Sequence, residues 1–152
     1  MSSLDANITE LYKSHQASQQ KYTYFVLAAA GASIGFAVQK TEGLPLSWWL
    51  VPAALAVAAW GASFYFGCKV IDWTQSVLFA NYAMLQLKQG SHPQQPRPHE
   101  APYALEGVQE ALEGNRQKAN TFYIWQFRML LWGAVFFIAW RVVEAYRLTV
   151  GA

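Results

Sequence analysis

The side chains able to take part in chemistry are few, and most lie outside the apolar parts of the chain. His92 and His99, with Glu100 directly after His99, could hold a metal ion, but no cysteine joins them in this proline-rich stretch. The only cysteine, Cys68, cannot form a disulfide within the chain. Inside the apolar runs no serine, cysteine or carboxylate has a neighbouring base, so we predict no enzyme activity, no cofactor and no metal.

Arg128 is the one formal charge inside an apolar run. A charge at membrane depth costs a few kcal/mol and often marks a functional site. Two interpretations stay open for this intramembrane charge. The guanidinium can reach the lipid headgroups unaided from near the end of its run. Alternatively it pairs with Asp72, just past the preceding run, or with the hydroxyl of Tyr65 or Ser63 inside that run.

Three apolar runs must position these side chains: residues 22–39, 46–66 and 121–143. Each is about long enough to cross a hydrocarbon core of roughly 30 Å as a helix. Charged residues make up 13% of the chain, well below the roughly 25% of soluble domains. Trp48 and Trp49 stand at the end of a run, where aromatic belts belong. The sequence predicts an all-α integral membrane protein with three transmembrane helices, partnered by the lipid bilayer.

The segment between the second and third runs, residues 67–120, has the pattern of two packed helices. Gly90 and the four prolines within residues 91–102 predict a turn that divides it. Helices 2 and 3 are therefore predicted to extend into a cytoplasmic antiparallel helical hairpin, a coiled-coil stalk. Its seam consists of apolar residues at steps of three and four: Val70, Trp73, Val77, Met84, Leu87, Leu105, Val108 and Leu112.

The two ends of the chain complete a single membrane domain over residues 1–152. Residues 1–21 repeat the seam spacing more weakly, through Leu4, Ile8 and Leu11, and predict an amphipathic N-terminal helix. Residues 144–152 are expected to form a tail on the far side of the membrane.

Lysine and arginine are distributed unevenly between the two sides of these spans. The positive-inside rule makes the richer side cytoplasmic, so the N-terminus is expected in the cytoplasm and the C-terminus outside. Alanine, tryptophan and glutamine usage is compatible with a bacterial inner membrane. The richer side holds Lys13, Lys21, Lys69, Lys88, Arg97, Arg116 and Lys118, and the poorer side holds Lys40, Arg141 and Arg147.

Small residues in the first two spans predict close helix packing. Gly31 and Gly35 are four residues apart, as are Ala54, Ala58 and Ala62. Such spacing lets two backbones approach each other in lipid. We favour contact between these two helices within one chain, and contact between chains is the alternative. The third span is too bulky for this mode, and its large side chains are expected to meet lipid or a partner: Trp125, Trp132, Phe136, Phe137 and Trp140.

Two functions fit this organisation. A net charge of +2, dispersed along the chain, argues against nucleic acid as a partner. The first hypothesis is a non-catalytic structural or accessory subunit that assembles with itself or within a larger membrane complex. The alternative is an oligomeric pore or membrane-permeabilising effector whose stalk senses a trigger. That alternative uses Arg128 and the polar residues Ser33, Gln39, Ser63 and Gln126.

Overall fold

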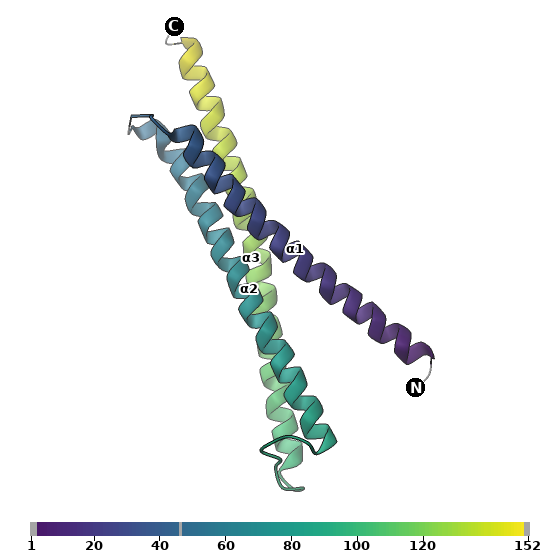
Figure 1. Ribbon diagram of the computed structural model, residues 1–152. Coiled ribbons are helices and arrows are strands. Elements are labelled where there is room, and N and C mark those ends of the chain that lie inside the picture. The colour runs from purple at the N-terminus through teal and green to yellow at the C-terminus, as the bar shows by residue number, and fades with distance from the viewer. Residues whose placement is uncertain (1–2, 46, 151–152) are drawn as a thin grey trace. The chain divides into compact units, whose positions relative to one another are not determined.

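Three long α-helices make up almost all of the chain (Figure 1). A computed structural model describes the backbone of residues 3–45 and 47–150, and those ranges contain no strand. The prediction of an all-helical chain with three long apolar helices is confirmed. The helices are α1 (Ser3–Thr41), α2 (Val51–Gln89) and α3 (Ala101–Val150), with a short 3-10 turn, η1 (Trp48–Leu50), leading into α2.

The helices are longer than a membrane requires. α1 and α2 have 39 residues each and α3 has 50. At 1.5 Å per residue, α1 and α2 are each about 58 Å long and α3 is about 75 Å long. By length and composition all three could cross a membrane, within Ala17–Thr41, Trp48–Gln89 and Ala101–Thr149. Leu46, the first residue of the expected second span, lies outside the described residues.

The chain divides into two compact units. Unit 1 consists of Met1–Gly67 and Trp125–Ala152, and unit 2 of Cys68–Ile124. In unit 1 the three helices pack together around a small core of Ala37, Ala56 and Trp60. Along the contact between α2 and α3, lower residue numbers on one helix meet higher ones on the other, as the pairs Ser63–Gln126 and Trp60–Leu130 show, so these two helices run antiparallel.

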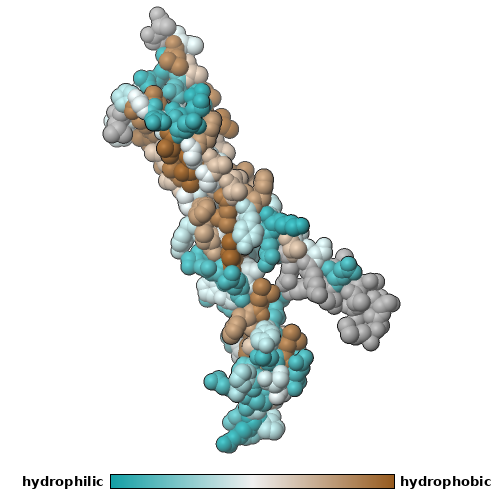
Figure 2. Space-filling view, viewed as in Figure 1, coloured by the Kyte–Doolittle hydropathy of each residue, from teal (hydrophilic) through white to brown (hydrophobic). Residues whose placement is uncertain are grey.

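Apolar surface, brown and tan in Figure 2, covers much of the drawn face of unit 1, with teal patches between. Large hydrophobic side chains are exposed on all three helices, among them Phe25, Phe64 and Ile138. A helix that is apolar on its outer face as well as its inner face is typical of a protein surrounded by lipid. This agrees with the membrane character read from the composition.

Unit 2 contains the second half of α2, the first half of α3 and the loop between them. Val70, Val77 and Leu112 are each only 7% exposed. The Lys118 ammonium lies 4.4 Å from the ring centroid of Trp73. The two helical segments of this unit are therefore in direct contact.

Gly90 ends α2, as the sequence predicts. Its φ of 70° lies in the left-handed region that favours glycine. The N–H of Gly90 donates to the Leu87 carbonyl at 3.3 Å, and the N–H of Ser91 donates to the Gln86 carbonyl at 3.0 Å. This pair of bonds is the Schellman motif, which satisfies carbonyls left open at a helix end.

The start of α3 differs from the expectation. The helix begins at Ala101, so Pro102 is helical and not part of the turn. Proline is tolerated in a first turn because its missing N–H would have no partner there. The Glu100 carboxylate accepts the Arg97 N–H at 3.3 Å just before the helix. At its other end α3 continues to Val150, so most of the expected tail is helical.

α1 begins at Ser3, which makes the expected N-terminal segment helical in its backbone. The side chains of Leu4, Ile8 and Leu11, which carry its apolar pattern, lie outside the described residues.

Candidate functional site

The small residues singled out by their spacing lie away from the helix contacts of unit 1. Gly31 and Gly35 are exposed, and a Cβ added to either would meet no atom within 4 Å. Ala54 and Ala58 are exposed as well, and Ala62 is half-buried. The buried small residues of the first two helices are instead Ala30, Ala37, Ala53, Ala56, Ala59, Ser63 and Gly67.

Trp60 is a large buried side chain at the contact between α2 and α3, and it needs a glycine opposite. It is 4% exposed, and its indole N–H donates to the Leu130 carbonyl at 3.2 Å. Any Cβ at Gly133 would collide with the indole ring. The centroid of the Phe137 ring lies 5.6 Å from that of the indole. The bulky residue and the glycine thus fix how the two helices face each other.

Gln126 makes a second contact of this kind, with a polar side chain. The Ser63 hydroxyl donates to its backbone carbonyl at 2.8 Å. Its side chain is buried, and neither amide atom bonds to another described residue. A Cβ at Gly67 would lie 2.5 Å from the Gln126 amide nitrogen and 2.6 Å from Leu27. All three helices therefore meet at Gly67.

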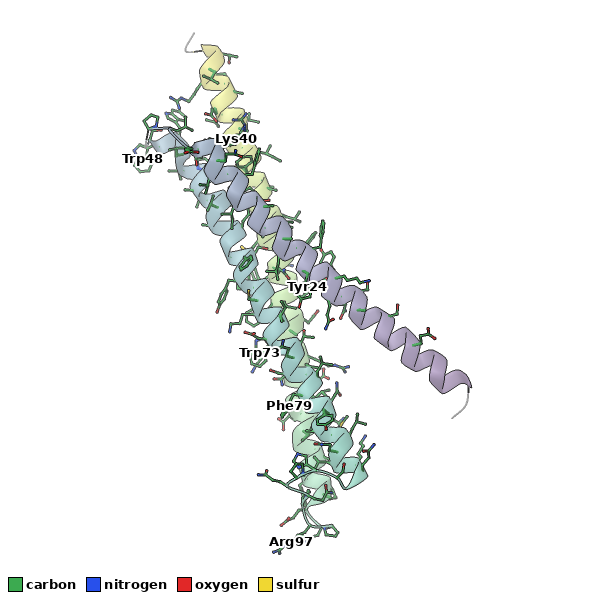
Figure 3. The ribbon with its side chains drawn as sticks, viewed as in Figure 1. Tyr24, Lys40, Trp48, Trp73, Phe79 and Arg97 are labelled. Carbon is green, nitrogen blue, oxygen red and sulfur yellow. The ribbon has the colours of Figure 1, made fainter. Side chains whose placement is uncertain are left out.

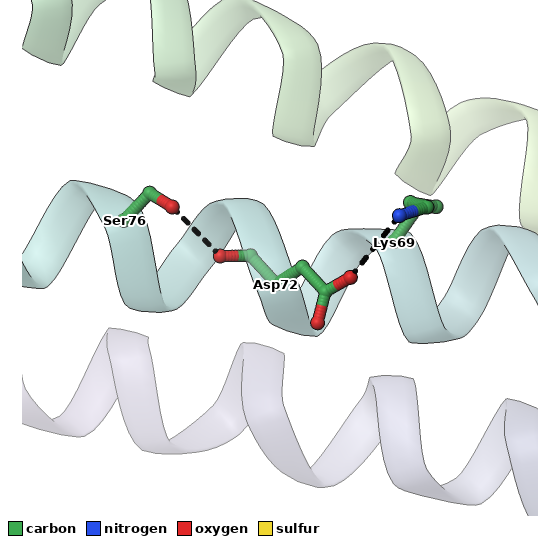
Figure 4. A network of polar contacts seen from close by, with 3 residues as sticks. All are labelled: Lys69, Asp72 and Ser76. Atoms are coloured by element: carbon green, nitrogen blue, oxygen red, sulfur yellow. Dashed lines mark hydrogen bonds and ion pairs between the residues drawn. The ribbon is translucent and has the colours of Figure 1, made fainter.

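Arg128 lies on the exposed surface of α3. Its guanidinium carbon is 5.6 Å from the ring centroid of Trp125, one helical turn away. Two of the partners suggested for it have other contacts. Asp72 pairs with Lys69 at 3.3 Å (Figure 4), and Ser63 bonds to α3 through its own hydroxyl. An exposed guanidinium beside a tryptophan fits the interpretation that Arg128 reaches the headgroups along the protein surface.

The other polar residues of the pore hypothesis are divided between the inside and the outside of unit 1. Ser63 and Gln126 are 0% and 1% exposed within a single chain. Ser33 is half-buried and Gln39 is exposed. A path enclosed between several chains would leave the two buried residues unused.

The aromatic side chains of α3 in unit 1 point in two directions. Trp125 and Trp132 are exposed, and Trp132 stacks on Phe136 at 5.8 Å. Trp140 is 2% exposed and lies 5.4 Å from Phe137 inside the bundle. Only part of this group is therefore available to lipid or a partner.

In unit 2 the predicted seam residues all lie at least partly out of solvent. Three of them are buried, as given above, and the others are half-buried: Trp73, Met84, Leu87, Leu105 and Val108. These side chains come from both helical segments of the unit.

A second apolar surface on α2 was missed by the sequence reasoning. Leu78, Phe79, Tyr82 and Leu85 are 42%, 75%, 60% and 54% exposed. Residues 78, 82 and 85 follow the helical steps of four and three, and Phe79, labelled in Figure 3, lies beside them. We call this surface the α2 face. Its signal in the sequence is a second apolar period, shifted by about one residue from the seam.

The α2 face belongs to the charged half of its helix. No charged residue occurs from Val51 to Cys68, whereas Lys69, Asp72 and Lys88 follow. An uncharged stretch of this length is sufficient to cross the hydrocarbon core. The α2 face is thus an exposed apolar surface beyond the part of α2 best suited to lipid.

Among the described residues no group of three histidine, cysteine, aspartate or glutamate side chains is placed to hold a metal ion. Comparison of the chain with models of known protein families, with curated proteins and with solved structures gives no match.

Proposed function

We propose that this protein is a non-catalytic structural subunit of a membrane complex, and that copies of it associate through the α2 face. The proposal is supported above all by the exposure of Leu78, Phe79, Tyr82 and Leu85 on one side of unit 2. Burying one such side chain contributes about 1.5–3 kcal/mol. Contiguous exposed apolar surface in contact with water is typical of an interaction site.

The chemistry of the α2 face suits a second copy of itself. No charged residue lies between Asp72 and Lys88, so two such faces can meet without like charges opposite each other. Aromatic residues such as Phe79 and Tyr82 are common in the centres of protein interfaces. A symmetric dimer uses the same patch on both chains, which a single self-complementary surface provides.

The membrane arrangement that goes with this function has three parts. Three helices cross a bacterial inner membrane with the N-terminus in the cytoplasm and the C-terminus outside, as the lysine and arginine distribution favours. The halves of α2 and α3 in unit 2 form an antiparallel hairpin stalk in the cytoplasm. The stalk presents the α2 face to the neighbouring copy.

The first test is the mass of the complex after gentle extraction from its native membrane, compared between two variants. Phe79 and Tyr103 are both 75% exposed aromatic residues of unit 2, but only Phe79 belongs to the α2 face. We expect the unchanged protein and Tyr103→Glu to form a complex of at least two copies, with a mass that is a whole-number multiple, twofold or higher, of 17.1 kDa. Phe79→Glu should weaken the association roughly tenfold or more, because a carboxylate would have to be buried in the interface.

Three results would contradict the proposal: an unchanged protein that is monomeric at every concentration, a Phe79→Glu complex of unaltered mass, or equal loss with Tyr103→Glu. A complex whose mass requires a different polypeptide would instead identify this protein as an accessory subunit of a larger assembly.

A further inference from the structure

A groove of about 1110 Å³ opens in unit 1, between the connection from α1 to α2 and the last turns of α3. Its volume is slightly above the range of about 300–1,000 Å³ usual for ligand pockets. Most of its lining is apolar or aromatic. The residues that matter here are Leu44, Trp49 and Leu50 on one side and Trp140, Val143 and Arg147 on the other.

A single cation is positioned across this groove. The guanidinium carbon of Arg147, on α3, lies 5.1 Å from the ring centroid of Trp49, on the opposite wall. Among the described residues no carboxylate forms an ion pair with Arg147. A guanidinium over an indole ring still has N–H groups in its own plane, and these can donate to a phosphate oxygen.

The acidic residue in the lining of the groove is already paired. The Glu144 carboxylate lines the groove, is 23% exposed, and accepts a hydrogen bond from Arg141 at 3.3 Å. The pair is neutral as a whole, so Arg147 gives the groove its net positive charge. This charge favours a ligand with a net negative headgroup.

The tryptophans beside the groove favour a position at the depth of the lipid headgroups. Trp48 and Trp49 mark this end of the predicted spans, and tryptophan is enriched at the membrane surface. The rise from Trp140 to Arg147 is about 10 Å along the helix. The headgroup layer is about 5–8 Å thick on each side of the hydrocarbon core. The apolar floor at Trp140 and the cation at Arg147 therefore match an acyl chain and the phosphate above it.

We propose that this groove binds one anionic glycerophospholipid of the adjacent leaflet, with the phosphate on Arg147 and an acyl chain along Leu50, Trp140 and Val143. Lipid binding here requires no contact between copies of the chain, so it is independent of association through the α2 face. No part of unit 2 is involved.

The test measures which lipid stays bound when the protein is released from vesicles. The full chain is reconstituted in equal amounts of phosphatidylglycerol and phosphatidylcholine, and native mass spectrometry counts the lipids retained per chain. We expect about one phosphatidylglycerol to be retained in clear excess over phosphatidylcholine. Arg147→Gln should reduce its retention at least about tenfold, because a charge-assisted hydrogen bond to phosphate is lost.

The matched control is Arg97→Gln, which removes the same charge from the exposed loop of unit 2. It should retain phosphatidylglycerol as the unchanged protein does. Trp49→Leu, which keeps the groove apolar but removes the ring under Arg147, should give an intermediate loss. A thermal unfolding curve for each variant shows that it is folded.

The proposal is overturned if folded Arg147→Gln retains as much phosphatidylglycerol as Arg97→Gln, if both variants lose it equally, or if the two lipids are retained equally by the unchanged protein. A second copy in the groove would also overturn it. In that case no lipid is retained, and the unchanged protein forms a dimer that Arg147→Gln dissociates.

Discussion

At Gly133 the lack of a side chain lets the indole of Trp60 lie directly against the α3 backbone, where it reaches the Leu130 carbonyl. The indole cannot easily move aside, because it is 4% exposed and packed against Phe137. In lipid, where burial of apolar surface between helices gives little driving force, such close packing is a main source of helix association. The absence of a side chain at Gly133 therefore contributes strongly to the packing of α2 against α3.

We expect Gly133→Ala to destabilise unit 1 by about 1–3 kcal/mol, the usual range for added atoms in a packed core. Gly61 is the matched control, because it is helical and a Cβ there would meet nothing within 4 Å. Gly61→Ala should leave stability unchanged or raise it by up to about 1 kcal/mol, since alanine favours helix. Thermal unfolding in mild detergent, followed by tryptophan fluorescence, measures both. Equal shifts for the two variants would refute this role of Gly133.

At the scale of the helices, the sequence predicts which segments are helical better than which side of each helix packs. The uncharged stretch Val51–Cys68, the glycine at position 90 and the apolar steps of the seam depend on neighbours along the chain, so they can be read directly. The packing side of α1 and α2 could not be read in this way. Small residues occur nearly all round both helices, so the spacing of Gly31 and Gly35 fits one side as well as another.

What selects the packing side is the bulk on the opposite helix. Trp60 requires Gly133, and Gln126 requires Gly67. Both pairings join residues more than fifty positions apart, which no local pattern reveals. The α2 face is hidden in the sequence for a related reason. Leu78 and Leu85 directly follow the seam residues Val77 and Met84, so the two apolar periods overlap along the chain.

The turn between α2 and α3 gives a prediction at the same scale. Gly90→Ala should destabilise unit 2 by about 1–2 kcal/mol, because a residue with a Cβ resists the left-handed conformation at φ 70°. Gly107→Ala is the control, because Gly107 is inside α3, exposed, and has open space around it. Hydrogen exchange of the amides near the end of α2 should speed up in the first variant only. Unchanged exchange in Gly90→Ala would show that the Schellman bonds do not limit the stability of this end.

At the scale of the whole molecule, length and charge together limit how the chain can sit in a bilayer. A helix of 39 residues such as α2 is about 58 Å long, nearly twice the hydrocarbon thickness of roughly 30 Å. Even a steep tilt of 40° would bury only about 39 Å of it. Since the first half of α2 is uncharged and the second carries Lys69, Asp72 and Lys88, the second half is the one expected to project into water.

The side on which it projects can be measured with single cysteines. In a Cys68→Ser background, Glu42→Cys places a thiol between α1 and α2, and Ser91→Cys places one between α2 and α3; both positions are exposed. A membrane-impermeant maleimide added to intact bacterial spheroplasts should label Glu42→Cys and leave Ser91→Cys unmodified until the membrane is broken. The reason is the lysine and arginine excess on the side of residue 91, which resists translocation across the membrane. The reverse pattern would place the α2 face outside the cell and the lipid groove in the inner leaflet, while labelling of both thiols before lysis would mean that α2 does not cross the membrane.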